Sequence, residues 1–359
     1  MPPSVSPNCC AADVTDVFAV VLAGGRGERL WPLARQRAPK PLLRIRGRTL
    51  LHATLERVAA LGIGRERTLV VGSREHAAEL QAEAPGAHLV LEPAAGDTAR
   101  AVALSALAAL RVEGDPILWV LPSDHLVADP EPVVTAVRTA VAAARSHGLF
   151  FVFGTPAKDA STDYGWLLPG VSLHPAYSRL DEYVEKPDAA TASRIHAGGQ
   201  HLWNCGMFVL PVRALLEAMR RLQPGILFAA ERVAAGDAGE DTSTPRLSLD
   251  HAILEPATRE GLCGIVPLDY PRLDLGRLDG LAGLLEHDAR DNAVAGDVFA
   301  IDTARCMLLS DGTTLAALGL DDLIVIAERG VVLICARDRA SEVKRIVAEL
   351  SARGRKDLL

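Results

Sequence analysis

The sequence predicts an α/β fold in which a mixed, mostly parallel sheet is covered by helices on both faces and followed by a small β domain. Three observations support this prediction. Up to about Thr155, short β-rich runs alternate with longer segments of helical period. From about Asn292 the pattern changes to short β runs separated by turns. The 359 residues are 49% hydrophobic, which is enough for one large core and a smaller one.

The elements of the first part follow one another regularly. Strands are predicted at residues 17–25, 67–73, 88–93, 116–124 and 149–155. Helices are predicted at residues 50–62, 75–84, 98–112 and 131–148. This order is typical of a Rossmann-like sheet, which binds its ligands at the carboxyl ends of the strands.

The alternation loosens after Thr155. Residues 162–170 and 179–187 are typical of a hairpin, residues 203–211 of a strand and residues 212–254 mostly of helices. The C-terminal β runs end in a predicted helix at residues 340–354. We therefore expect a flexible tail at 1–16, a large domain at 17–290 and a small C-terminal β domain with a terminal helix at 291–359.

Charge and cysteine content exclude several classes of protein. The formal net charge of −7 argues against nucleic acid or an anionic membrane surface as the partner, so any anion site must be a local basic cluster. The six cysteines show no zinc or disulfide spacing, which indicates a reducing, cytoplasmic location. We find no secretory signal and no apolar stretch of the ~18 residues that a membrane span needs.

Three glycines end the first strand, in the stretch VVLAGGRGERLWPLARQRAPKPLL at residues 20–43. Glycines there bring bare backbone N–H groups close to a ligand, as a phosphate cradle requires. The stretch has no GK[ST], and Leu30 stands where a dinucleotide fingerprint needs its third glycine. Prolines on both sides of Lys40 restrict its backbone, so Lys40 and Arg29 suit a triphosphate.

This stretch resembles the start of the sugar-1-phosphate nucleotidyltransferases. Its RLWPL form is most similar to the mannose-1-phosphate guanylyltransferases, which make GDP-mannose. The resemblance extends from about Val17 to the last helix. It implies the nucleotide-diphospho-sugar transferase fold, with residues 17–290 as the catalytic domain. It also implies that the C-terminal element is a left-handed β-helix, often used for dimer contact, so we expect a homodimer.

Two carboxylates are candidates for a metal site. Asp124 ends the strand in WVLPSDHLV; a lone aspartate there could also cap a helix or a turn. The resemblance assigns it to Mg²⁺, together with Asp274 in PRLDLGRLDGL, and magnesium in phosphoryl chemistry takes one or two carboxylates plus phosphate oxygens. Arg272 and Leu278 replace two tryptophans of the family's segment.

Three short motifs resemble the family's sugar-phosphate segments. In YVEKP, the resemblance places Lys186 on the phosphate and Glu185 on sugar hydroxyls. In WNCGMF, the amide of Asn204 offers a donor and an acceptor to a sugar. In TDYGWL, Tyr164 precedes Gly165, which lets the sugar approach the backbone. Taken singly, these motifs are also common surface ion pairs and turns.

The segment LEPAAGDTARAV resembles the family's nucleobase segment, EPxGRNTAPA. A carboxylate at Glu92 accepts hydrogen bonds from the N1–H and amino group of guanine, whereas adenine presents an acceptor there. The sequence departs from the family pattern at Ala95, Gly96, Asp97 and Arg100, so the base preference rests on an altered segment.

The resemblance thus implies a complete set of site residues. The catalytic residues are Arg29, Lys40 and Lys186. The nucleotide-binding residues are Leu22, Ala23, Gly24, Gly25, Gly27, Arg29, Lys40, Glu92, Asp97, Thr98 and Asp124. The sugar-phosphate-binding residues are Tyr164, Gly165, Glu185, Lys186 and Asn204, and the Mg²⁺ ligands are Asp124 and Asp274.

The expected reaction is in-line attack of α-D-mannose 1-phosphate on the α-phosphorus of GTP, giving GDP-mannose and pyrophosphate without a general base. Three alternatives stay open. The same chemistry could use another sugar 1-phosphate, such as a heptose, or another nucleotide. The chain could be a catalytically silent subunit that binds GDP-mannose and regulates a partner. A plain nucleotide-binding domain would leave VEKP and WNCGMF unexplained.

Overall fold

The computed structural model describes residues 13–25, 27–36, 38–45, 47–92, 98–127, 129–237, 244–270, 272–274 and 278–359. The chain divides into two compact units, each built from segments that are distant in sequence. The described residues of the first unit lie within Met1–Gly24, His52–Ser123 and Ala128–Pro271. Those of the second unit lie within Gly25–Leu51, Asp124–Val127 and Arg272–Leu359.

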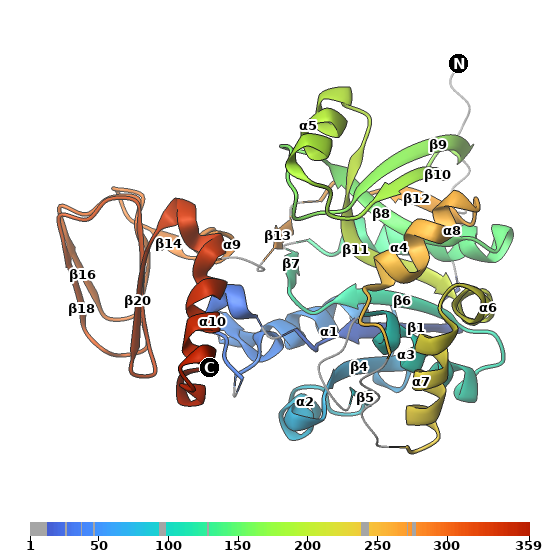
Figure 1. Cartoon of the computed structure of the whole chain (residues 1–359), viewed down its shortest axis with the longest axis horizontal. Coiled ribbons are helices and arrows are strands. Elements are labelled where there is room, and N and C mark those ends of the chain that lie inside the picture. The colour runs from blue at the N-terminus through green and yellow to red at the C-terminus, as the bar shows by residue number, and fades with distance from the viewer. Residues whose placement is uncertain are drawn as a thin grey trace. The chain divides into compact units, whose positions relative to one another are not determined.

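The first unit is built on a nine-stranded sheet, counted over the described residues, in the order β5-β4-β1-β6-β11-β8-β12-β10-β9 (Figure 1). The strands are β1 (Val17–Leu22), β4 (Thr68–Ser73), β5 (His88–Glu92), β6 (Ile117–Pro122), β8 (Phe150–Pro156), β9 (Trp166–His174), β10 (Tyr177–Val184), β11 (Leu202–Pro211) and β12 (Cys263–Pro267). The pairs β5–β4, β4–β1, β1–β6 and β8–β12 are parallel. The antiparallel pairs involve β11 or the β9–β10 hairpin. The predicted mixed sheet is confirmed, and antiparallel pairs enter it where these later strands join.

Helices cover this sheet on both faces. Every residue from Val17 to Val21 in β1 is fully buried, which requires cover on both sides of the strand. On one side, α3 (Thr98–Val112), α6 (Val212–Leu222) and α7 (Pro224–Ala234) pack on one another and share a core with the strands. The helix α4 (Glu131–His147) contacts β8, β11 and β12.

This unit also contains three shorter helical segments. They are α5 (Ala189–Gly198), the π-helical turn Asp250–Leu254 and the helix α8 (Glu255–Arg259) that continues it. The remaining helices of this part are α1 (Leu50–Ala60), which starts in the second unit's sequence, and α2 (Ala77–Glu83). The π-helical turn lies at the end of the region predicted to be mostly helical.

The second unit contains the C-terminal strands. They are β14 (Glu286–His287), β15 (Ala293–Ala295), β16 (Val298–Ile301), β17 (Met307–Ser310), β18 (Leu315–Leu318), β19 (Leu323–Glu328) and β20 (Val331–Ala336). The pairs β15–β17, β17–β19 and β16–β18 are parallel, as successive turns of a β-helix would be. The helices α9 (Leu278–Ala282) and α10 (Lys344–Ala352) accompany these strands.

The glycine-arginine stretch folds with these C-terminal strands. Leu30 and Trp31 share one buried core with Met307, Ile324 and Ile326. The sequence analysis assigned this stretch to the large domain, and the boundary proposed after residue 290 stays a prediction. Among the described residues, no helix is both long enough and apolar enough to cross a bilayer.

Candidate active site

Lys40 is held rigidly in the second unit. Pro39 precedes the 3₁₀ turn Lys40–Leu42, and Lys40 is only 7% exposed. Gly27, which has a φ of 67°, lies against this side chain: a Cβ added there would come within 2.8 Å of Lys40 Cβ. The predicted restriction of Lys40 therefore has a second cause, because only a glycine fits at position 27.

Lys40 forms an ion pair with Asp124. Its ammonium donates to Asp124 Oδ2, and His125 Nε2 lies 3.9 Å from Asp124 Oδ1. Burial opposes the ionisation of Asp124, but the charges of Lys40 and His125 outweigh it and hold the pKa of this carboxyl below its ordinary value. Asp124 is thus an ionised acceptor at neutral pH, which a metal ligand must be.

The backbone brings Asp274 to the same place. The short strands β7 (His125–Val127) and β13 (Arg272–Asp274) pair antiparallel, and Asp274 lies opposite His125. The Asp274 side chain, like residues 275–277, lies outside the described part of the structure. Among the described residues no cluster of three or more metal-ligating side chains occurs. The donors at hand, one or two carboxylates, fit a magnesium ion that also binds phosphate oxygens.

One backbone N–H group at the end of β1 is used within the sheet. The backbone N–H of Ala23 donates to Val71 O at 2.7 Å, so it is not available to a phosphate. Leu22 and Gly24 are half-buried, and Gly25 is exposed. Arg29 is half-buried in the 3₁₀ turn that follows Gly27, whereas Arg26, Arg37 and Asp97 lie outside the described residues.

Glu92 is buried at the end of β5 in the first unit. It is 3% exposed, and Arg100 Nε lies 3.6 Å from its Oε1. A Cβ added to Gly24 would lie 3.7 Å from Glu92 Oε2, so this carboxylate faces the end of β1. Arg100, one of the departures from the family pattern, is therefore an electrostatic partner of the residue predicted to read the base.

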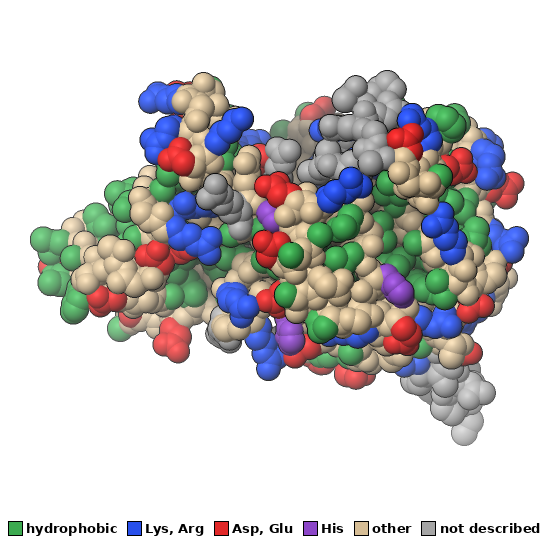
Figure 2. Space-filling model, turned by 90° about the horizontal axis from the view of Figure 1, so that it is seen from below, with side chains coloured by type: hydrophobic (Ala, Val, Ile, Leu, Met, Phe, Trp, Pro, Cys, Tyr) green, Lys and Arg blue, Asp and Glu red, His purple; other side chains and the backbone are tan. Residues whose placement is uncertain are grey.

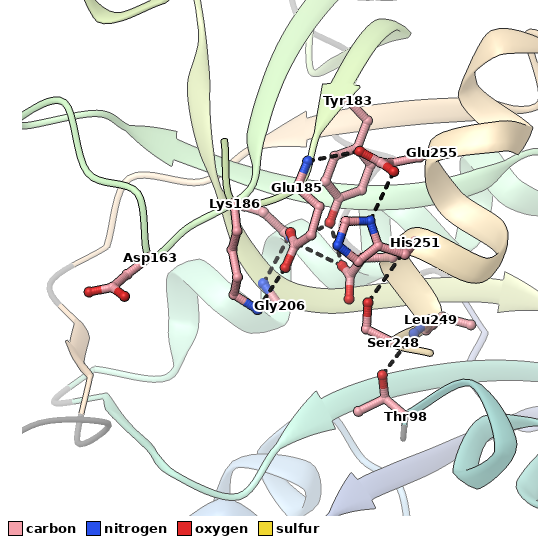
Figure 3. A network of polar contacts seen from close by, with 12 residues as sticks. Thr98, Asp163, Tyr183, Glu185, Lys186, Gly206, Ser248, Leu249, His251 and Glu255 are labelled. Atoms are coloured by element: carbon pink, nitrogen blue, oxygen red, sulfur yellow. Dashed lines mark hydrogen bonds and ion pairs between the residues drawn. The ribbon is translucent and has the colours of Figure 1, made fainter. Parts of the chain in front are cut away.

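Thr98 has a structural partner. Its Oγ1 accepts a hydrogen bond from Leu249 N at 2.8 Å (Figure 3). This bond ties the start of α3 to the segment immediately before the π-helical turn. The predicted contact between Thr98 and a nucleotide is untested by this geometry.

Glu185 and Lys186 follow β10 and point toward each other (Figure 3). Lys186 Nζ lies 2.8 Å from Glu185 Oε1, and Lys186 is largely exposed whereas Glu185 is buried. Glu185 Oε2 is buried and accepts no hydrogen bond from the described residues. Burial, followed by the nearby Asp250 charge, raises the pKa of Glu185. A buried acceptor that receives no hydrogen bond from the protein usually has a partner that is not part of the protein.

Gly165 leaves room beside this carboxylate. A Cβ at position 165 would lie 2.5 Å from Glu185 Oε2, so any other residue would clash with it. Gly165 O also accepts from Asn204 N at 2.7 Å, which joins the two predicted sugar motifs. The ring of Tyr164 packs on that of Trp203, with centroids 4.9 Å apart. These residues, predicted from separate motifs, do come together.

The amide of Asn204 is largely occupied by the protein. Its Nδ2 donates to Tyr183 Oη and, at 3.1 Å, to Asp250 Oδ1. Its Oδ1 accepts from Gly206 N at 2.9 Å. Tyr183 in turn donates to Asp250, and burial together with that carboxylate raises the pKa of Tyr183 well above its ordinary value. Asn204 is thus fixed in one orientation by the protein itself.

The sequence analysis did not identify Asp250, Glu255 or Tyr183 as site residues. Glu255 Oε1 accepts from Glu185 N at 2.9 Å, and Glu255 Oε2 lies 3.0 Å from His251 Nδ1 (Figure 3). The two acids come from SLDHAILE, which the sequence shows only as part of a helical segment. Its one usable signal is the acid pair itself, five residues apart.

Comparisons with known proteins show which families the chain matches. A family model described as "Nucleotidyl transferase" matches residues 18–240, and one described as "MannoseP isomerase/GMP-like beta-helix domain" matches residues 296–350. The xanthan biosynthesis protein XanB of Xanthomonas campestris is 35% identical, over 96% of this chain and 75% of that protein. The mannose-1-phosphate guanylyltransferase of Escherichia coli is 32% identical, over 92% of this chain and 73% of that protein.

A solved structure is similar over almost its whole length. It is described as a mannose-1-phosphate geranyltransferase from Thermus thermophilus, is 35% identical and gives a TM-score of 0.83, covering 94% of this chain and 99% of that one. The chain spans about three quarters of the length of the two curated relatives above.

Proposed function

Because the chain belongs to the nucleotidyl transferase family, we propose that it joins GTP to α-D-mannose 1-phosphate and releases pyrophosphate, which makes GDP-mannose. The family takes a nucleotide and a sugar phosphate as substrates. The observation that carries the proposal is the Glu185–Lys186 pair. It sets a buried, unsatisfied acceptor for a hydroxyl beside an ammonium for a phosphate.

The reaction needs charge compensation and alignment more than proton transfer. A phosphate oxygen of the sugar 1-phosphate forms a bond to the α-phosphorus, and the bond from that phosphorus to the bridging oxygen of pyrophosphate breaks. The attacking oxygen is already ionised at neutral pH, so no general base is required. Lys186 holds the attacking phosphate, while Lys40 and Arg29 compensate the charge of the triphosphate.

Asp124 and Asp274 are the residues that we propose to hold Mg²⁺. The ion would neutralise charge on the triphosphate and on the departing pyrophosphate. Asp124 suits this role because its lowered pKa keeps it ionised. Thermal unfolding measured with Mg²⁺ and GTP should show stabilisation that Asp124→Asn loses.

Glu92 is our candidate for base selection. Its carboxylate would accept from the N1–H and amino group of guanine, with Arg100 keeping the charge compensated. The alternative is the same chemistry on another base or sugar. Pyrophosphate release measured across GTP, ATP, UTP and dTTP, each with mannose, glucose and heptose 1-phosphates, discriminates between these substrates.

A catalytically silent binding subunit is the second alternative. Asp124→Ala and Lys186→Ala should each cost several kcal/mol of transition-state stabilisation, about 10²-fold or more in kcat/KM. Near-normal turnover in either purified variant contradicts the assigned roles. Binding of GDP-mannose with no turnover by the unmodified protein would support the silent subunit instead.

We also propose a homodimer and a cytoplasmic location. Exposed apolar side chains gather on the C-terminal strands, at the left of Figure 2. They are Phe299, Ile301, Leu318, Val332 and Ile334, each more than 60% exposed. An apolar patch of this kind marks a protein contact, and sedimentation of the unmodified chain against Ile301→Asp tests it. Free thiols at the described cysteines agree with a reducing compartment.

A further inference from the structure

Lys186 has an unfavourable backbone conformation. Its φ is 44°, in the left-handed region that residues with a side chain rarely adopt. Pro187 follows, and a residue before proline is further restricted to extended conformations. Such a conformation persists only where the surrounding structure imposes it, and it is common at functional sites. The contacts that impose it here are therefore of interest.

Glu255 contacts the backbone of Glu185, the residue that precedes Lys186. Its Oε1 accepts from the backbone N–H of Glu185 at 2.9 Å, directly beyond the last residue of β10 (Figure 3). The Glu255 side chain is 16% exposed, and His251 Nδ1 lies 3.0 Å from its other oxygen. Both oxygens of Glu255 are thus engaged, which fixes the position of the carboxylate.

Asp250 makes a similar contact two residues earlier, with Tyr183 in β10. It accepts from the hydroxyl of Tyr183, two residues before Glu185. Two acids therefore hold the end of β10: Asp250 accepts a hydrogen bond from the Tyr183 side chain, and Glu255 accepts one from the Glu185 backbone.

The π-helical turn explains why both acids reach the strand. Glu255 N donates to Asp250 O, a bond between residues five apart where an α-helix joins residues four apart. From this wider turn Asp250 reaches Tyr183 and Glu255 reaches Glu185. In an ordinary α-helix, residues five apart point in different directions.

Stability alone is a poor reason for this arrangement. The Asp250 charge acts on the buried Glu185 carboxyl and raises its pKa, and such repulsion between like charges lowers stability. Together with the strained Lys186, this repulsion indicates that the position of the lysine is what the arrangement maintains.

We propose that Glu255 and Asp250 are positioning residues that clamp the end of β10, hold Lys186 in its left-handed conformation and so direct its ammonium toward the phosphate of the sugar substrate. The clamp itself follows from the contacts, whereas the identity of the anion rests on the proposed function.

The kinetic test separates the two substrates. Glu255→Ala should raise KM for mannose 1-phosphate about tenfold and leave KM for GTP within about twofold. A tenfold change corresponds to the loss of one hydrogen bond at the strong end of the usual range. Glu255→Gln keeps an oxygen that accepts from Glu185 N and should restore most of the affinity. The matched control is Glu260→Ala, because Glu260 follows the same helix, pairs with Arg221 at the surface and should leave both constants unchanged.

A double-mutant cycle tests whether Glu255 acts through Lys186. In a Lys186→Ala background, Glu255→Ala should raise KM no further. An equal increase in KM for mannose 1-phosphate with and without Lys186 overturns the proposal, as does an equal increase in KM for both substrates in the single variant.

Hydrogen exchange tests the clamp without any substrate. The Glu185 amide should exchange faster in Glu255→Ala than in the unmodified protein, and should stay protected in Glu255→Gln and in the Glu260 control. Unchanged exchange in Glu255→Ala overturns the clamp. If exchange responds as expected but the unmodified protein does not turn over GTP and mannose 1-phosphate, the proposed function fails and the clamp stands.

Discussion

The ion pair between Lys40 and Asp124 gives a prediction whose size follows from its burial. The Lys40 side chain is 9% exposed and that of Asp124 is 27% exposed. Lys40→Met keeps the length of the side chain and removes the charge, so an ionised carboxylate stays partly buried without its ammonium. Removing one partner of a buried pair costs roughly 3–5 kcal/mol, and the partial exposure of Asp124 puts this pair at the lower end, about 3 kcal/mol.

The pH dependence of this loss has a definite sign. Lys40 and His125, acting against burial, hold the pKa of Asp124 below 3.8 in the folded state. A carboxyl with a depressed pKa stabilises the fold above its unfolded pKa, and that contribution disappears as the pH falls through the folded pKa. In Lys40→Met the unpaired carboxyl has a higher pKa than in the unmodified protein, so the difference in unfolding free energy should be largest at about pH 8 and shrink as the pH falls toward 3.8.

Urea unfolding followed by circular dichroism measures both quantities. Adding Asp124→Asn to Lys40→Met should recover part of the lost free energy, because no uncompensated charge then remains. Lys344→Met, at the exposed start of α10, is the matched control. The reasoning is refuted if Lys40→Met unfolds within about 0.5 kcal/mol of the unmodified protein, the range of ordinary surface substitutions, or if its deficit is the same at about pH 3 and about pH 7.

Three other changes have expected outcomes. Burial and the Asp250 charge raise the pKa of Glu185, so ionisation of this carboxyl lowers stability as the pH rises above 4.5. Glu185→Gln should therefore raise the free energy of unfolding at about pH 8 while impairing use of the sugar phosphate. An unchanged pH profile of unfolding would contradict this. Arg100→Met removes the cation 3.6 Å from the Glu92 carboxylate. It should lower the preference for GTP over ITP, which lacks the 2-amino group of guanine, about tenfold in kcat/KM. An unchanged ratio means that Arg100 takes no part in base selection. Burial raises the pKa of the Cys263 thiol to about 12, so mass spectrometry should find it unmodified by iodoacetamide at about pH 8 in the folded protein and alkylated in urea.

Much of the fold could be predicted because its signals are local. A nearly continuous apolar run such as Val17–Val21 specifies a strand that is buried on both faces, whatever its neighbours are. The hairpin and the strand at residues 203–211 were predicted in the same way. The antiparallel insertion of β11 between β6 and β8 depends on pairing between distant segments, which periodicity does not record.

The candidate site, like the fold, has features that the sequence predicted and features that only the structure revealed. The sequence by itself pointed to residues that we predict to bind the substrates: Lys40 between prolines, the Glu185–Lys186 pair, and Gly165 in TDYGWL. Their residue types and short spacing can be read directly from the sequence, so motif recognition is enough to find them.

Only the tertiary structure decided how these groups are held. Lys40 pairs with Asp124, 84 residues away, and the Asn204 amide is used by Tyr183 and Asp250. Asp250 and Glu255 contact the end of one strand from a π-helical turn and the residue that follows it. Sequence periodicity assumes an α-helix, in which those two acids would diverge, so the positioning of the lysine became visible only in the folded chain.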